Sequence, residues 1–281
     1  MARSHIEPGW PAGHFYSPIP NFSDVTERKH VIFDQSRDVL PGIDLNDEGQ
    51  LNRLRELARF YDDQPFGIQK RDGLHFYFDN PNFGRGEAIV LQAMMRLLRP
   101  KRMIEIGSGF SSGAMLDVDL LYLGGQTEFL FVEPYPDLLK SLLNPDDLSR
   151  TRIHDMPVQA VDLAEFDVLE ANDILFIDSS HVSKTGSDVN HIYFEILPRL
   201  KPGVFVHIHD IGYPFEYPED WVMKGRAWNE AYLLRAFLMY NPMFTIEYYA
   251  GYLAAIRRGE LLAHMPMCAE TPGSSIWLRR Q

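Results

Sequence analysis

The 281-residue sequence has a single cysteine, Cys268. One thiol cannot form an intrachain disulfide or supply a zinc site built from several cysteines, which is typical of a protein that works in a reducing compartment. No apolar run approaches the roughly 20 residues that a membrane-spanning helix needs, and the first residues hold no apolar core of signal-peptide length. We therefore expect a cytoplasmic protein without a membrane span.

Positive charge is also scarce. The 27 Lys and Arg residues stand against 39 Asp and Glu, which gives a net charge of −12. No basic cluster of the kind that binds phosphate backbones is present, so nucleic acid is not an expected partner. Hydrophobic residues make up 45% of the chain, enough for one large packed core.

A glycine turn follows a short apolar segment at residues 102–113, RMIEIGSGFSSG. Gly107 and Gly109 allow a sharp turn and a close approach of the backbone to a ligand. The carboxylate of Glu105 could accept hydrogen bonds from an amino group and favours a positively charged ligand over a pyrophosphate. Hydroxyl groups stand where a helix is expected to begin, on Ser108, Ser111 and Ser112. These are features of a site for S-adenosylmethionine.

A nicotinamide-dependent oxidoreductase is the alternative, because G-x-G-x-x-G also follows a strand and opens a helix. The register differs here. The third glycine would fall at position 112, which is Ser112, and Gly113 comes one residue late.

Further short apolar runs are expected to be strands. Residues 128–133 and 173–178 each end in an acid, Glu133 and Asp178, while residues 200–210 contain a Pro-Gly turn followed by a strand. A short strand is expected near 151–154, and residues 244–257 and 274–280 are expected to form a final pair of strands. Helices should separate the strands, which gives an α/β fold.

This order resembles the class I S-adenosylmethionine-dependent methyltransferases over residues 85–281. The resemblance implies a Rossmann-like seven-stranded sheet with helices on both faces, and it leaves residues 1–84 as an N-terminal extension and cap. It assigns the methionine part of the cofactor to the turn from Glu105 to Ser112 and the ribose to Glu133. The adenine would lie near Pro157 and Val158, and Asp178 would also border the cofactor.

Four polar residues gather where two expected neighbouring strands end: Asp178, His181, His209 and Asp210. Two carboxylates at adjacent strand ends repel each other unless one is protonated or a cation lies between them. Metal-dependent O-methyltransferases of the catechol type, and magnesium-using methyltransferases of macrolide sugars, resemble this chain in their acids at these strand ends. The resemblance implies a divalent metal, magnesium or manganese, at Asp178 and Asp210, and adding His209 gives a mixed oxygen and nitrogen set that could also hold it. A histidine ligand departs from the usual oxygen set, so iron or no metal also stays open.

His181 lies three residues after Asp178, the spacing at which some sugar-modifying relatives carry their base. A neutral imidazole could remove the proton of an alcohol near neutral pH. Aromatic residues beside polar groups suit a sugar or aromatic acceptor, and Tyr213, Phe215, Tyr217, Trp221, Arg226 and Trp228 follow the last of these acids. We expect O-methylation of a hydroxyl on a small molecule or glycan precursor, by catalytic Asp178, His181 and Asp210. A non-catalytic S-adenosylmethionine-binding protein is a further alternative, and a homo-oligomer is possible.

The remaining elements follow from apolar spacing. Residues 1–45 are expected to be extended or turning rather than helical, because proline and glycine recur there. A helix over about 226–240 is expected to be deeply covered. Further helices are expected at about 47–61, before Pro100, and over 112–123, 136–143 and the segment before Pro202.

Overall fold

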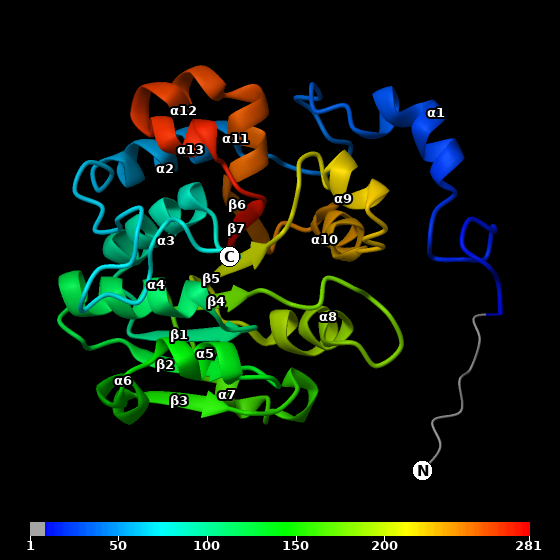
Figure 1. Cartoon of the computed structure of the whole chain (residues 1–281). Coiled ribbons are helices and arrows are strands. Elements are labelled where there is room, and N and C mark those ends of the chain that lie inside the picture. The colour runs from blue at the N-terminus through cyan, green and yellow to red at the C-terminus, as the bar shows by residue number, and fades with distance from the viewer. Residues whose placement is uncertain (1–8) are drawn as a thin grey trace, which may run out of the picture.

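A seven-stranded sheet forms the centre of the molecule, described over residues 9–281 in a computed structural model (Figure 1). The strand order is β3-β2-β1-β4-β5-β7-β6. Strands β1 to β5 are parallel, and β7 runs antiparallel between β5 and β6. The bounds are β1 Arg102–Ile106, β2 Glu128–Val132, β3 Thr151–His154, β4 Ile174–Ile177, β5 Phe205–His209, β6 Phe244–Tyr249 and β7 Ser275–Arg280. The predicted fold class is confirmed, and the last two strands pair with each other as expected.

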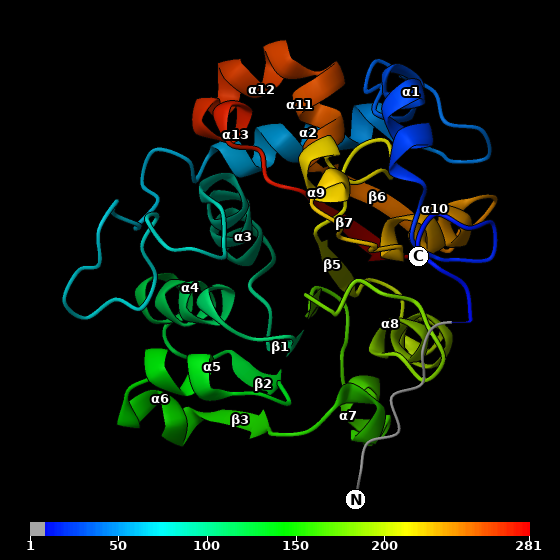
Figure 2. The same ribbon diagram turned by 45° about the vertical axis from the view of Figure 1, so that its right-hand side comes forward.

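Helices cover both faces of the sheet, as Figure 2 shows with α3, α4 and α5 on one side and α7, α8 and α10 on the other. Every residue of β4 and β5 is buried, which is why these segments read as continuous apolar runs rather than alternating ones. The helices on the first face are α3 Arg85–Leu98, α4 Phe110–Val118, α5 Asp137–Leu142 and α6 Pro145–Arg150. The others near the sheet are α7 Ala164–Asp167, α8 Asp188–His191, α9 Glu219–Met223 and α10 Glu230–Leu238.

The N-terminal segment packs on the far end of the sheet through helix α2, Asp47–Ala58. Leu51, Leu54 and Leu57 repeat at helical spacing and are buried in the common core. Gln50 links the two parts, since its amide donates to the Leu45 carbonyl at 2.6 Å and its Oε1 accepts from the Tyr249 N–H at 2.7 Å. The first eight residues of the predicted 1–84 cap lie outside the described range.

Two expectations are wrong and one is too strong. Residues 22–32 form helix α1, Phe22–Ile32, where no regular helix is expected; only its Val25 is buried, so no apolar stripe announces it, and Asn21 caps it by accepting from the Ser23 N–H. The strand expected over 244–257 ends at Tyr249, and the chain continues as α11, Ala250–Ile256. Helix α10 is covered on one side only, because Tyr232 is exposed.

Helices α12 Arg258–His264 and α13 Pro266–Glu270 complete the connection from β6 to β7. Among residues 9–281, no helix combines the length and the apolar character that a membrane crossing needs.

The carboxyl ends of β1, β4 and β5 meet at one edge of the sheet. The register pairs Ile177 with Ile208, so that Asp178 follows at the level of His209 and Asp210 comes one residue later at the same edge. Gly107 turns the chain there with φ of 81°, and a Cβ at this position would lie 1.9 Å from the Asp178 carbonyl oxygen. Glycine is therefore needed for β1 to turn so close to the end of β4.

Candidate active site

Asp178, His181 and Asp210 come together at this edge. Nε2 of His181 lies 3.2 Å from Oδ1 of Asp178 and 3.4 Å from Oδ2 of Asp210. One ligand atom from each residue falls within 4.8 Å of the others, a set of oxygen and nitrogen atoms that a divalent metal can use. The expected approach of the two aspartates is confirmed, with the imidazole between them.

A buried glutamate holds the other side of His181. Nδ1 of the ring lies 2.9 Å from Oε2 of Glu230, and the Ser179 hydroxyl donates to the same oxygen at 2.8 Å. Burial lowers the pKa of His181, but its contacts with Asp178 and Glu230 outweigh burial and raise the pKa to about 9. These neighbours favour the protonated ring, so His181 can act as a base only in the fraction of molecules whose ring is neutral.

The backbone is strained at two of the three residues. His181 has φ of 58° and Asp210 has φ of 56°, in the left-handed region that few residues other than glycine adopt. Such conformations cost of the order of 1 kcal/mol or more, and they persist where the surrounding structure imposes them, often at functional sites.

His209 borders this set of three and is paired with a different carboxylate. Its Nε2 is 3.1 Å from Oε1 of Glu87, and its ring lies against Phe83. Burial lowers the pKa of His209, yet Glu87 and Asp178 raise it well above the usual range. Its Nδ1 is 3.4 Å from Oδ1 of Asp210 and 3.6 Å from Oδ1 of Asp178, so it borders the metal set but is not the histidine that completes the three-residue group.

His207 stacks on Phe176 with ring centroids 3.9 Å apart. Burial lowers its pKa well below the usual value, so the ring is neutral. Neither of its nitrogens has a hydrogen-bond partner among the described residues.

A cavity of about 480 Å³ opens beside Asp178. Five predicted cofactor residues line it: Gly107, Glu133, Pro157, Val158 and Asp178. Its other walls come from the ends of β1 and β2 and from the loop before α8. The volume is in the range of small-molecule sites, and its place beyond the carboxyl ends of parallel strands is where such sites form.

Glu105 does not line this cavity. Its carboxylate is fully buried and accepts hydrogen bonds from the hydroxyls of Ser111 and Ser112, on the first turn of α4. Burial raises the pKa of Glu105 to about 8, although these hydroxyls lower it. Glu105 therefore stabilises the glycine turn from the protein interior, and both of its carboxylate oxygens already accept a hydrogen bond.

Glu133 fixes the other side of the same turn. Its Oε2 accepts from the Ser108 N–H at 3.1 Å and its Oε1 accepts from the Tyr135 N–H at 2.8 Å. Each carboxylate oxygen has two lone pairs, so capacity remains for a ligand's hydroxyls. Gly109 closes the turn by donating to the Ser112 hydroxyl at 3.0 Å.

Sequence reasoning missed Glu230 and Glu87. Glu230 is fully buried at the start of α10, and Glu87 lies in the first turn of α3, where its Oε1 also accepts from the Ser274 N–H. The signal in the sequence that could have identified them is a single carboxylate in the first turn of a mostly apolar helix. That pattern is also typical of a helix first turn, where acids are favoured by the helix dipole, and so it did not distinguish these residues.

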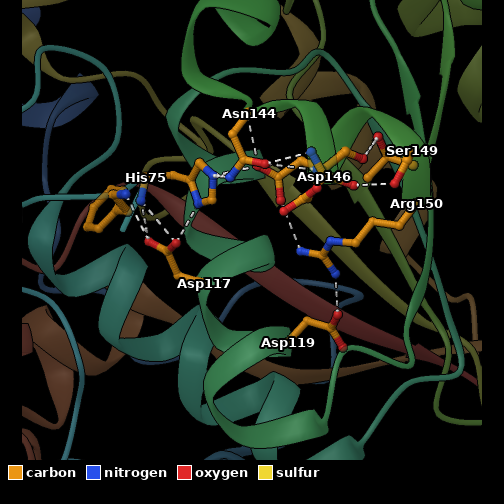
Figure 3. A network of polar contacts seen from close by, with 10 residues as sticks. His75, Asp117, Asp119, Asn144, Asp146, Ser149 and Arg150 are labelled. Atoms are coloured by element: carbon orange, nitrogen blue, oxygen red, sulfur yellow. Dashed lines mark hydrogen bonds and ion pairs between the residues drawn. The ribbon is translucent and has the colours of Figure 1, made fainter. Parts of the chain in front are cut away.

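A second buried histidine cluster lies away from this edge, between α4 and α6 (Figure 3). Nδ1 of His75 is 2.6 Å from Oδ1 of Asp117, and Nε2 is 2.7 Å from Oδ2 of Asp147. Asp117 also accepts from the N–H groups of His75 and Phe76, and Arg150 joins Asp147 to Asp119. The cluster fastens the loop before α3 to the sheet's helices.

A model of a methyltransferase domain matches residues 104–211, from β1 to just beyond β5. An uncharacterized protein of Archaeoglobus fulgidus is 37% identical over 184 residues, covering 63% of this chain and 82% of that protein.

Solved structures that resemble the chain include two methyltransferases. The S-adenosylhomocysteine-bound PaMTH1 of Podospora anserina is 13% identical with a TM-score of 0.47, and the match covers 94% of this chain and 99% of that one. The O-methyltransferase TomG of Streptomyces achromogenes, in complex with S-adenosylmethionine, is 16% identical with a TM-score of 0.42, over 80% and 87% of the chains.

Proposed function

We propose that this chain, which belongs to the class I S-adenosylmethionine-dependent methyltransferase superfamily, transfers a methyl group to a hydroxyl of a small molecule or glycan precursor. The observation that carries the proposal is the convergence of Asp178, His181 and Asp210 beside the 480 Å³ cavity. An oxidoreductase on a similar sheet is disfavoured, because the usual dinucleotide fold has no antiparallel strand inserted beside β5.

The cavity supports a specific placement of the cofactor. The free lone pairs of Glu133 suit the two ribose hydroxyls, and Pro157 and Val158 offer an apolar surface for the adenine. Gly107 lets the cofactor's methionine part approach the backbone. Ser111 and Ser112 donate hydrogen bonds to Glu105, and these bonds hold the turn in place.

The reaction needs an acceptor oxygen and a place for its proton. A lone pair of the oxygen attacks the sulfonium methyl carbon, the carbon–sulfur bond breaks, and its electron pair stays on sulfur. Glu230 holds Nδ1 of His181, which leaves Nε2, in the neutral form of the ring, to take the hydroxyl proton. In the alternative with a metal, Nε2 of His181 would instead join Asp178 and Asp210 as a ligand of a divalent cation, which would lower the pKa of a nearby hydroxyl.

Calorimetric titration with S-adenosylmethionine, S-adenosylhomocysteine and NAD tests the cofactor class. We expect micromolar binding of the first two only. Glu133→Gln should weaken it about 10-fold or more, since the ribose hydroxyls would lose charged acceptors. Glu128→Gln, at the exposed opposite end of β2, is the matched control. Binding of NAD alone, or of none of the three, would overturn the proposal.

A screen of hydroxyl compounds with labelled S-adenosylmethionine, run with EDTA and with added magnesium or manganese, tests the reaction. Methyl transfer to oxygen that disappears in Asp178→Asn supports the centre. Cofactor binding with no transfer in any condition would leave a non-catalytic binding protein instead.

A further inference from the structure

We infer that the acceptor carries an anionic group, a carboxylate, beside its hydroxyl-bearing ring, and that Arg226 receives it. This inference rests on the proposed function. It concerns the segment between α9 and α10, which the methyl-transfer centre itself does not use.

Arg226 is held by two tryptophans rather than by an acid. Its guanidinium carbon lies 4.5 Å from the ring centroid of Trp221 and 4.8 Å from that of Trp228. Such stacking fixes the plane of a guanidinium and leaves its N–H groups free at the edge. Among residues 9–281, no carboxylate lies within 4.0 Å of Arg226 and its side chain donates no hydrogen bond. By contrast, Arg96 stacks on Tyr122 and is also paired with Asp63.

Trp228 connects Arg226 to the reacting centre. Its ring centroid lies 4.5 Å from that of His181, at an interplanar angle of 45°. Tyr217 borders the same indole at 5.9 Å and Trp221 at 5.5 Å, which makes an aromatic wall. The guanidinium therefore lies one indole away from the imidazole that faces Asp178 and Asp210. An acceptor whose ring lies along this wall would have its hydroxyl end at the aspartates and its far substituent at Arg226.

The surrounding charge explains why a cation is useful there. Asp178, Asp210 and Glu230 meet at His181, and the whole chain carries a net charge of −12. An anionic acceptor would be repelled by this field unless a positive group met its charge. The planar fork of arginine binds a carboxylate through two parallel hydrogen bonds, which lysine cannot reproduce.

A matched pair of probes tests the inference: 3,4-dihydroxybenzoate and its methyl ester, titrated in EDTA with and without saturating S-adenosylhomocysteine. The wild-type protein should bind the carboxylate about 10-fold or more tightly than the ester. Arg226→Gln should abolish the preference, and Arg226→Lys should retain part of it. Arg59→Gln is the control, since Arg59 is exposed and stacks on Phe60 at 5.8 Å on α2's side of the molecule.

Equal binding of the two probes by the wild-type protein, binding of neither probe, or a preference that persists in Arg226→Gln would overturn the inference. Failure of the proposed function looks different. In that case S-adenosylhomocysteine would not bind, yet the Arg226-dependent preference would remain in the titration without it, and the anion site would stand by itself.

Discussion

Two buried histidines in this protein, His75 and His181, each lie between carboxylates. Their carboxylate partners differ in how exposed they are and in how many of their oxygens remain free to bind a ligand. At His75, the side chains of Asp117 and Asp147 are 0% and 1% exposed, and both accept further hydrogen bonds from the backbone or Arg150. At His181, the side chains of Asp178 and Asp210 are 37% and 17% exposed. One cluster is closed within the protein, and the other opens beside a cavity.

The difference lies in the capacity of each cluster to bind a ligand. A charged network whose members are all satisfied internally rigidifies the fold and has nothing left to bind a ligand. At the sheet edge, like charges are held together on strained backbone with accessible oxygens, an arrangement that gains by taking up a cation or substrate. A buried histidine with acidic partners is therefore not by itself a site.

The largest expected effect breaks the closed cluster. Asp117→Asn should reduce the free energy of unfolding by about 3 to 5 kcal/mol, because His75 loses one of its two carboxylate partners and two backbone N–H groups lose a charged acceptor. Urea unfolding followed by circular dichroism measures it. Asp24→Asn, on exposed helix α1, should change the value by less than about 0.5 kcal/mol. A loss no greater than that of the control would show that the cluster does not stabilise the fold.

Asp210→Asn, in the open cluster, should lower activity and leave stability largely unchanged. Asparagine tolerates the left-handed backbone at this position, so the fold should persist. Methyl transfer to the acceptor found in the screen should fall about 100-fold or more, as for loss of a group at the reacting centre. Asp220→Asn, in the neighbouring helix α9, is the control. Full activity in Asp210→Asn would remove this residue from the reaction.

Glu230→Gln sharpens the comparison, because Glu230 supports His181 as Asp147 supports His75. The amide keeps the shape but not the charge, and we expect about a 10-fold lower kcat with little change in KM. Asp147→Asn is the counterpart, and it should lower stability while leaving kcat unchanged. Glu230→Asp should not restore kcat, because its shorter side chain would leave the carboxylate farther from Nδ1 of His181. A KM effect alone would contradict the positioning role.

The smallest effect is a pH dependence of stability at His75. The hydrogen bond to Asp117 raises the pKa of His75 despite burial, with further contributions from Asp147. The histidine therefore stabilises the fold fully below its ordinary pKa near 6.5, and this stabilisation is lost as pH rises through the higher folded value. The difference in unfolding free energy between wild type and His75→Gln should shrink from pH 6 to pH 9. His30→Gln, exposed on α1, should show no such trend.

Much of the fold could be predicted because its signals are local. The apolar runs before Gly107, Glu133, Asp178 and Asp210 each became a parallel strand, since a strand buried on both faces must be apolar throughout. Helix α1 could not be found this way, because it buries only Val25 and its signal is a single cap.

The site, like the fold, has features that local sequence patterns predict and features that they do not. The sequence alone determined that acids and glycines end successive strands, and strand polarity then required them to share one edge of the sheet. Only the tertiary structure decided their roles: Glu105 turned inward to two serines, His181 rather than His209 completed the group of three, and Glu230, 52 residues after Asp178, came to support it. The physical reason is that burial and partners of a side chain depend on contacts between distant segments, which no local pattern of residues encodes.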